Sequence, residues 1–314
     1  MSATRREFLQ RSAALGLGAL LPKLPAAAPR HAGMPPVYLF SKHLQFLGYA
    51  DMADAARGMG FDGLDLTVRP GGHVLPERAA DDLPRAAAAL RQAGFEPRMM
   101  VTAITDAADP LTRPLLAAAR AQGFSLYRSG WLHYPDTGSI PDALEGFRAR
   151  IRGLADLNAE LGIRGAYQNH TGQSLGAAIW DLHRVLEGLP AGRFGSQYDV
   201  RHATAEGGYA WFHSLRLIAP YINSLAIKDF IWQKSSRGWE AASVPIGEGM
   251  VDFVRFFRFL RQQQIEVPMS LHVEYPLGGA DQGHTALSIP ASEVFQAMKR
   301  DLARVRAYWE QAAE

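Results

Sequence analysis

Eight short runs of β-forming residues recur along the chain, and longer stretches with helical patterning separate them. The runs are rich in apolar and β-branched residues, as buried strands are. We predict strands at Val37–Phe40, Gly63–Val68, Glu96–Val101, Ser125–Tyr127, Gly165–Asn169, Phe194–Val200, Ser224–Lys228 and Pro268–Glu274. Eight strand–helix units in series predict a closed parallel barrel.

The segments between these runs carry stop signals of helices. Gly94, Gly123 and Gly162 each follow a helical pattern, and glycine often ends a helix because it adopts left-handed dihedrals without strain. No linker or second domain is indicated, so we predict a single α/β domain, a (β/α)8 TIM barrel. The alternative fold is a doubly wound open sheet. Its nucleotide-binding forms are disfavoured, because their glycine-rich phosphate-binding motifs do not occur in the sequence.

The N-terminal region has the pattern of a twin-arginine signal peptide. Arg5 and Arg6 precede Phe8 and Leu9, an apolar stretch follows over residues 13–21, and small residues occupy 26–28. The apolar stretch is far shorter than the roughly 20 residues that span a bilayer. We therefore predict a signal peptide over residues 1–30 and the barrel over 31–314. This predicts export of the folded protein by the twin-arginine machinery, a periplasmic location and no stable membrane anchor.

The composition argues against a nucleic-acid partner and excludes any site built from cysteine. The chain has 33 basic and 31 acidic residues, and the predicted signal peptide carries more of the basic ones, so the mature part is close to neutral. We therefore expect no nucleic-acid partner. The chain has no cysteine, which excludes disulfides, thiolate metal sites and a cysteine nucleophile.

Polar side chains crowd the ends of the predicted strands, where barrels of this kind place their chemistry. The residues after the first, second and fourth runs include Lys42, His43, Arg69, His73, Trp131 and His133. The later runs end in Gln168-Asn169-His170, Tyr198-Asp199-Val200-Arg201-His202, Lys228-Asp229 and His272-Val273-Glu274. This clustering predicts a functional site, whereas His183 and His213 lie inside helical patterns and are interpreted as structural.

These segments resemble, in order, those of the xylose isomerase-like TIM barrel family, also called the sugar phosphate isomerase/epimerase family. The resemblance covers most of the mature chain and rests on Gly60-Phe61-Asp62-Gly63-Leu64-Asp65, Gln168-Asn169-His170-Thr171-Gly172, Tyr198-Asp199-Val200-Arg201-His202-Ala203, Ile227-Lys228-Asp229-Phe230, Ile246-Gly247-Glu248-Gly249 and Ser270-Leu271-His272-Val273-Glu274. It implies a metal-assisted enzyme that isomerises or epimerises sugars, with Glu, Asp, His and Glu ligands on strands five to eight.

The chain departs from this ligand pattern at three of four positions. Gln168 stands for the first Glu, Ala226 for the His and His272 for the last Glu, and Asp199 alone matches. Alternation along a strand brings His170, Lys228 and Glu274 to the same side as these positions. Two readings stay open: a divalent ion (Mn, Mg, Zn or Co) held by Asp199, Glu274, His272 and Gln168, or the charge of Lys228 in its place.

The expected chemistry is removal of a proton beside a carbonyl of a carbohydrate, which needs a base and a positive group. The candidate catalytic residues are Glu274, Lys228, His202 and His170. The candidate substrate-binding residues are Lys42, Arg69, His73, Trp131, Tyr198 and Trp232. Because the amide of Gln168 cannot accept a proton, a lyase or hydrolase acting on oxidised glycosides is the alternative to a two-base epimerase.

The sequence is also compatible with other roles for individual segments and for the whole barrel. The long polar segment from Trp232 to Gly249 predicts a lid or a subunit contact, so a homo-oligomer is left open. A non-catalytic sugar-binding barrel would keep Arg69, His73 and the aromatic residues and would not depend on Glu274. Phosphodiester cleavage by the endonuclease branch of the family is disfavoured by the near-neutral charge and the missing ligands.

Overall fold

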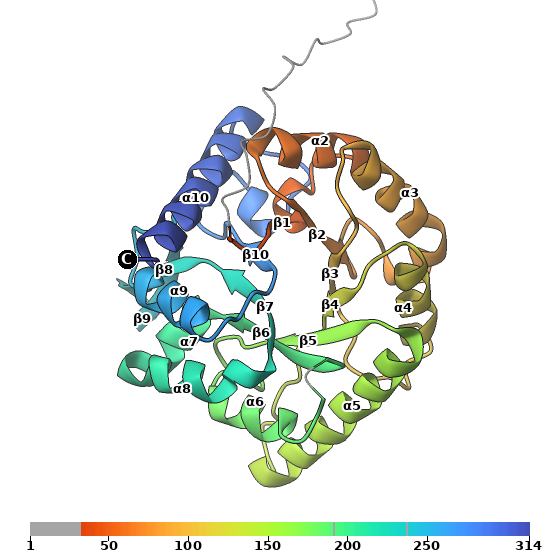
Figure 1. Ribbon diagram of the computed structural model, residues 1–314, viewed down its shortest axis with the longest axis vertical. Helices are drawn as coiled ribbons and strands as arrows, with labels where there is room; N and C mark the ends of the chain where they lie inside the picture. Colours follow the sequence, from red (N-terminus) through yellow and green to blue (C-terminus); the bar gives the residue numbers. More distant parts are fainter. Residues whose placement is uncertain (1–32, 191, 237) are drawn as a thin grey trace, which may run out of the picture.

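The computed structural model describes residues 33–190, 192–236 and 238–314, so the predicted signal peptide lies outside the described residues. Eight parallel strands close into a barrel in the order β1-β10-β7-β6-β5-β4-β3-β2 (Figure 1). They are β1 Val37–Phe40, β2 Gly63–Val68, β3 Met99–Thr102, β4 Leu126–Arg128, β5 Arg164–Gln168, β6 Phe194–Asp199, β7 Ile222–Ile227 and β10 Met269–Leu271. The predicted single-domain (β/α)8 barrel is confirmed.

Helices surround the barrel as an outer ring (Figure 1). They are α2 Tyr49–Met59, α3 Ala79–Gln92, α4 Thr112–Ala121, α5 Ile140–Leu161, α6 Ile179–Leu186, α7 Val200–Gly207, α8 Trp211–Ile218, α9 Phe253–Gln262 and α10 Ala291–Gln311. None of the helices among the described residues is long and apolar enough to cross a membrane.

Local sequence signals explain where two of these helices begin and end. The Ser139 hydroxyl accepts the amide N–H of Asp142 at the start of α5, and Gly162 ends that helix with a φ of 67°, a left-handed value that favours glycine. The Asp199 side chain accepts the amide N–H of His202 at the start of α7. Asp199 therefore both ends a barrel strand and caps the next helix, which fixes its carboxylate at the barrel mouth.

The core has two layers. A small cluster inside the barrel consists of Tyr38, Met99, Leu126 and Ala166, and a large apolar layer lies between the strands and the helices. The inner cluster needs room at Gly63, where an added Cβ would approach the Tyr38 ring to 2.6 Å. This packing fills the barrel interior and leaves polar residues at its carboxyl-terminal end.

The segment expected to be a lid or a subunit contact is an antiparallel hairpin, formed by β8 Asp229–Ser235 and β9 Gly238–Val244. Asp229 anchors it: its carboxylate accepts the amide N–H groups of Phe230, Gly247, Gly249 and Val251 at 2.8–3.2 Å. Gly249 is required there, since a Cβ would lie 2.2 Å from the Asp229 carboxylate. The hairpin is thus fixed at its base to the end of β7.

Candidate active site

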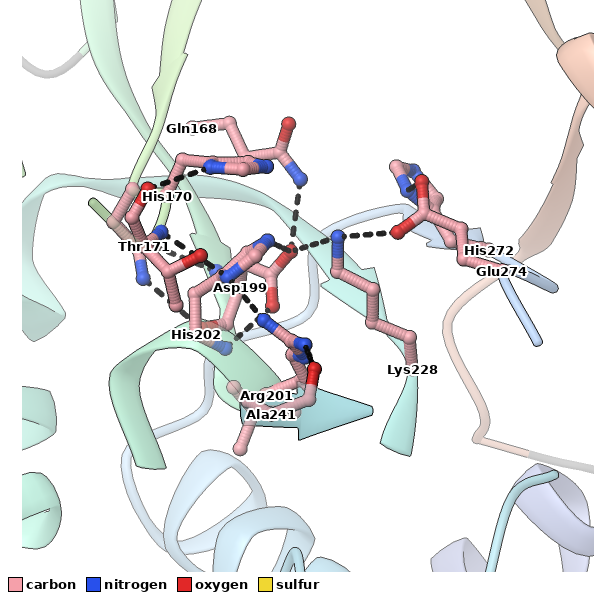
Figure 2. A network of polar contacts seen from close by, with 12 residues as sticks. Gln168, His170, Thr171, Asp199, Arg201, His202, Lys228, Ala241, His272 and Glu274 are labelled. Atoms are coloured by element: carbon pink, nitrogen blue, oxygen red, sulfur yellow. Dashed lines mark hydrogen bonds and ion pairs between the residues drawn. The ribbon is translucent and has the colours of Figure 1, made fainter. Parts of the chain in front are cut away.

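Four residues predicted to converge do so at the carboxyl-terminal end of the barrel (Figure 2). Gln168 ends β5, Asp199 ends β6, Lys228 follows β7 and Glu274 follows β10. Hydrogen bonds and ion pairs connect them in the series Gln168, Asp199, Lys228, Glu274. These four side chains therefore form one connected group at the carboxyl-terminal end of the barrel, where a site was expected.

The ammonium group of Lys228 lies between two carboxylates. Its Nζ is 3.1 Å from Asp199 Oδ2 and 3.0 Å from Glu274 Oε2, and the side chain is only 3% exposed. An ammonium group has three N–H donors, so the two carboxylates use two of them. No further partner of Lys228 occurs within the described ranges, which leaves one donor for another oxygen.

The amide of Gln168 is oriented by neighbours on both sides. Its Nε2 donates to Asp199 Oδ2 at 2.8 Å, and its Oε1 accepts from Arg128 Nη1 at 3.0 Å. The amide therefore presents N–H groups, rather than an oxygen lone pair, toward Asp199. Arg128 was not among the predicted site residues, although its position two residues after the inward-facing Leu126 indicates the same inward side of the strand.

The hydrogen bonds of His202 define its tautomer. Its Nδ1 accepts from the Thr171 amide N–H at 3.2 Å and from Arg201 Nη1 at 2.8 Å. Both partners can only donate, so Nδ1 carries the lone pair and Nε2 carries the proton. Burial, followed by the charge of Lys228, holds the pKa of His202 well below its ordinary value. His202 therefore has no free lone pair with which to accept a substrate proton.

The neighbouring His170 has the opposite tautomer. Its Nδ1 lies 2.9 Å from the Thr171 carbonyl oxygen, which can only accept, so Nδ1 is protonated and Nε2 carries the lone pair. The ring packs between Trp131 and His202, with centroids 4.8 and 3.9 Å away. Burial, and next the charge of Lys228, lower the pKa of His170, which keeps it neutral and able to accept a proton.

Glu274 and His272 differ in charge: the carboxylate is ionised and the imidazole is neutral. Burial raises the pKa of Glu274, but Lys228, His272 and Lys42 outweigh it and hold that pKa well below its usual range; Lys42 Nζ is 3.2 Å from Oε1. Glu274 is thus an ionised carboxylate of low basicity. His272 stacks on Phe40, its two ring nitrogens are buried without a partner within hydrogen-bond distance, and burial lowers its pKa to about 3. The neutral ring of His272 therefore serves as a packing surface beside Phe40.

His43, the neighbour of Lys42, holds two loops together. Its Nδ1 donates to the Ala280 carbonyl at 3.1 Å, and its Nε2 accepts the Val273 amide N–H at 2.9 Å. Burial, and next the charge of Lys42, lower its pKa to about 3. This clamp requires the neutral ring and fixes the segment that carries Glu274.

The clamp predicts a pH effect on stability. The unfolded chain protonates His43 near pH 6.5 and the folded chain only near pH 3, so between these values the unfolded state binds more protons and stability falls as pH falls. His43→Gln removes this contribution. We expect the stability difference between wild type and variant to shrink by roughly 1.4 kcal/mol per pH unit below 6.5. Urea unfolding at pH 7.5, 6 and 5 measures it, and a difference that stays constant would contradict the clamp.

A small cavity of about 60 Å³ opens among these residues. Eight of its ten lining residues are predicted site residues: Lys42, Arg69, Trp131, Gln168, His170, Lys228, His272 and Glu274. The other two are Phe40 and Arg128. A larger hollow of about 380 Å³ lies at the opposite end of the barrel, around Arg57, Asp62 and Arg98. The connected polar network is at the small cavity, so we assign the site there.

Three predicted substrate-binding residues lie away from this cavity. Tyr198 points outward, because it alternates with the inward-facing Asp199, and it stacks on Phe256 of α9. His73 Nε2 donates to the Leu44 carbonyl, and its Nδ1 lies within hydrogen-bond distance of the hydroxyl groups of Ser41 and Thr67. His73 therefore ties the loops after β1 and β2 together. Trp232 lies on the hairpin, is 44% exposed and contacts Phe230. The structure corrects the expected positions of these three residues.

The residues at the site do not fit a divalent cation. Asp199 already accepts from Gln168, Lys228 and the His202 amide, and the Lys228 ammonium lies where an ion bridging Asp199 and Glu274 would have to be. Across residues 33–190, 192–236 and 238–314, no three His, Asp or Glu side chains are placed to hold a metal. Of the two readings left open by the sequence, the geometry favours the lysine.

The model of the xylose isomerase-like TIM barrel family matches residues 53–289, and the chain belongs to this family. Among solved structures, 3-keto-D-glucoside 4-epimerase YcjR from E. coli is 14% identical with a TM-score of 0.61, over 90% of this chain and 98% of that one. D-allulose 3-epimerase from Methylomonas sp., in complex with D-allulose, is 18% identical with a TM-score of 0.61, over 89% and 99%.

A third similar structure contains a metal ion. A xylose isomerase-like TIM barrel protein from Mycobacterium smegmatis, in complex with magnesium, is 13% identical with a TM-score of 0.63, over 90% of this chain and 100% of that one. A comparison with curated proteins found no match. At these identities the structures establish the shared fold, and membership of the family supports an enzymatic role for this chain.

Proposed function

We propose that this protein is a carbohydrate isomerase or epimerase-like enzyme that transfers a proton beside a carbonyl without a divalent metal. The observation that carries the proposal is the buried ammonium of Lys228 between Asp199 and Glu274, at the end of the barrel where the family places its chemistry. A positive group fixed in a site of low dielectric stabilises the negative oxygen of an enediolate. The third N–H of Lys228 is the donor for that oxygen.

His170 is the base in this proposal. Its Nε2 lone pair takes the proton from the carbon beside the carbonyl, and the electron pair of the broken C–H bond forms the enediolate. The Thr171 carbonyl, hydrogen-bonded to Nδ1–H, orients the ring and stabilises the imidazolium that results. In an isomerisation the proton then returns to the former carbonyl carbon, and the hydroxyl proton of the neighbouring carbon passes to the enediolate oxygen, which leaves a new carbonyl there. In an epimerisation a proton returns to the original carbon on its other face and the carbonyl re-forms. Both reactions are redox-neutral within the substrate.

A second function, elimination from an oxidised glycoside, is favoured by one observation. Gln168 cannot accept a proton, and His202 has no free lone pair, so the site has one base on one face. Symmetric two-base epimerisation requires two. After the same proton is removed, a leaving group on the next carbon would depart from the enediolate, and the protein would act as a lyase.

Removing metal ions tests the proposal. Protein dialysed against EDTA should convert a keto-sugar or a 3-keto-glycoside at the same rate as untreated protein, measured by chromatography of isomer, epimer and elimination products. The electrophile is a side chain, so no ion has to be restored. Loss of turnover that Mn²⁺ or Mg²⁺ restores would overturn the assignment of Lys228. A chain that binds these sugars and converts none of them would be a sugar-binding barrel.

We also propose that the protein acts in the periplasm after export by the twin-arginine machinery. The proposal rests on Arg5 and Arg6 and the apolar stretch behind them. Changing both arginines to lysine should retain the protein in the cytoplasm, because the export system reads that pair as an address. Fractionation and immunoblotting measure the distribution, with a Lys23→Arg variant as control. Recovery of the double variant in the periplasm at the wild-type level would contradict the proposal.

A further inference from the structure

Two arginines line the active-site cavity beside the lysines. Arg69 follows β2 and Arg128 ends β4, and both line the cavity that also contains Lys228 and His170. Arg128 is 3% exposed, and its guanidinium packs 4.3 Å from the Trp131 ring centroid. Arg69 is half-buried and lies 5.6 Å from the Phe40 ring centroid. Aromatic packing thus holds two cations at one wall of the cavity.

These arginines have no carboxylate partner, unlike the two lysines. Lys42 and Lys228 both pair with Glu274. In the part of the chain that the structure describes, no Asp or Glu oxygen lies within ion-pair distance of Arg69 or Arg128. The Arg128 Nε is buried without any hydrogen-bond partner, and its Nη1 donates to the neutral amide of Gln168. A buried guanidinium donor without a partner is costly, so this arrangement suits a ligand that supplies the acceptor.

The charges around the cavity leave an excess of cations. Its lining carries Lys42, Arg69, Arg128 and Lys228 against the single carboxylate of Glu274, and Asp199 below it pairs with Lys228. Burial, and then the charge of Arg69, lower the pKa of Arg128 to about 10, so it stays protonated at neutral pH. The buried carboxyl of Asp65 accepts a hydrogen bond from Ser270, and burial raises its pKa to about 6.

We propose that the substrate is an anionic sugar, whose carboxylate or phosphate group binds between Arg69 and Arg128 while its carbonyl faces Lys228. The proposal rests on the proposed function for the carbonyl and on the unpaired arginines for the anion. Planar guanidinium groups bind carboxylate and phosphate oxygens through paired N–H donors. A neutral keto-sugar would leave both arginines without a counter-charge.

Calorimetric binding of three probes tests this: D-glucuronate for a carboxylate, D-glucose 6-phosphate for a phosphate and D-glucose as the neutral reference. At least one anionic probe should bind about tenfold more tightly than D-glucose at low salt, and Arg69→Met should abolish that preference. Arg85→Met removes one charge on an exposed helix face and should preserve it. The probe that binds more tightly identifies the anion.

Two outcomes would overturn the proposal: neither anionic probe binds more tightly than D-glucose, or Arg69→Met keeps the preference. Binding and turnover separate this proposal from the proposed function. Tight binding of an anionic sugar without conversion of any keto-sugar would remove the proposed function and keep the anion site. Conversion of neutral and anionic keto-sugars with equal kcat/KM would remove the anion site and keep the proposed function.

Discussion

Replacing Lys228 with methionine is expected to reduce kcat by about 10²–10³, the effect of losing a fixed donor to a developing oxyanion. Methionine keeps the length of the side chain and removes the ammonium, so a substrate enediolate loses its positive partner. The same change leaves Asp199 and Glu274 without their shared cation. We expect stability to fall by about 3 kcal/mol, as when one partner of a buried ion pair is removed. Steady-state kinetics and urea unfolding on one preparation measure both effects.

A double variant separates the two effects of Lys228. In Lys228→Met with Glu274→Gln, one of the two carboxylates is neutralised, so a large part of the lost stability should return. Turnover should stay as low as in the single variant, because no positive group replaces the ammonium. If Lys228→Met folds and keeps more than a tenth of the wild-type kcat, about 1.4 kcal/mol of barrier, the lysine is a structural cation only.

Changing His170 to glutamine should lower kcat by about 10²–10⁴, the usual contribution of a positioned base. Glutamine fills a similar volume between Trp131 and His202 and cannot accept the proton. The Thr171 carbonyl is the one polar partner of the ring that the structure places, so the melting temperature should change little. Stopped assays of the single variant against wild type measure the rate.

The matched control for His170 is His133→Gln. His133 lies on the exposed surface and contacts Ser174, so its loss should leave kcat unchanged. The pH profile gives a second readout: wild-type kcat/KM should fall on the acid side with an apparent pKa below 6.5, since His170 has a lowered pKa, and the residual rate of His170→Gln should lack this limb. An unchanged acid limb in the variant would assign the base to another group.

The barrel could be predicted from the sequence because eight short strand-like runs alternate with longer helical stretches. β1 and β2 have the predicted bounds, and β10 is shorter than the predicted Pro268–Glu274. The amide of His272 still donates to the Ile227 carbonyl of β7, but the amide of Val273 donates to His43 instead of to the neighbouring strand, so the pairing ends there. The segment was predicted to be a lid or a subunit contact, and its two strands were not predicted because its polar centre hides the alternation of β8 and β9.

Strand alternation predicted which side chains at the strand ends face the site, and it predicted nothing beyond that. The positions of Gln168, Asp199 and Lys228 followed from that alternation. Tyr198 was predicted as a substrate-binding residue, although its alternation with Asp199 indicates the outward side on which it stacks on Phe256. Arg128 was missed, although it lies at a strand end. The tautomers of His170 and His202 could not be predicted, since they depend on Thr171 and Arg201 groups that only the folded loop brings together.

The anchoring of the hairpin by Asp229 determines which side of the cavity can admit a substrate. Four amide N–H groups bind the Asp229 carboxylate, and Arg201 binds the Ala241 carbonyl of β9. Displacing this hairpin would break all five contacts and disturb the backbone next to Lys228. The cavity of about 60 Å³ has room for roughly two water molecules, so a sugar needs more room. We expect that room to come from the side of the barrel across from β7, where the segments after β2 and β4 carry Arg69 and Trp131.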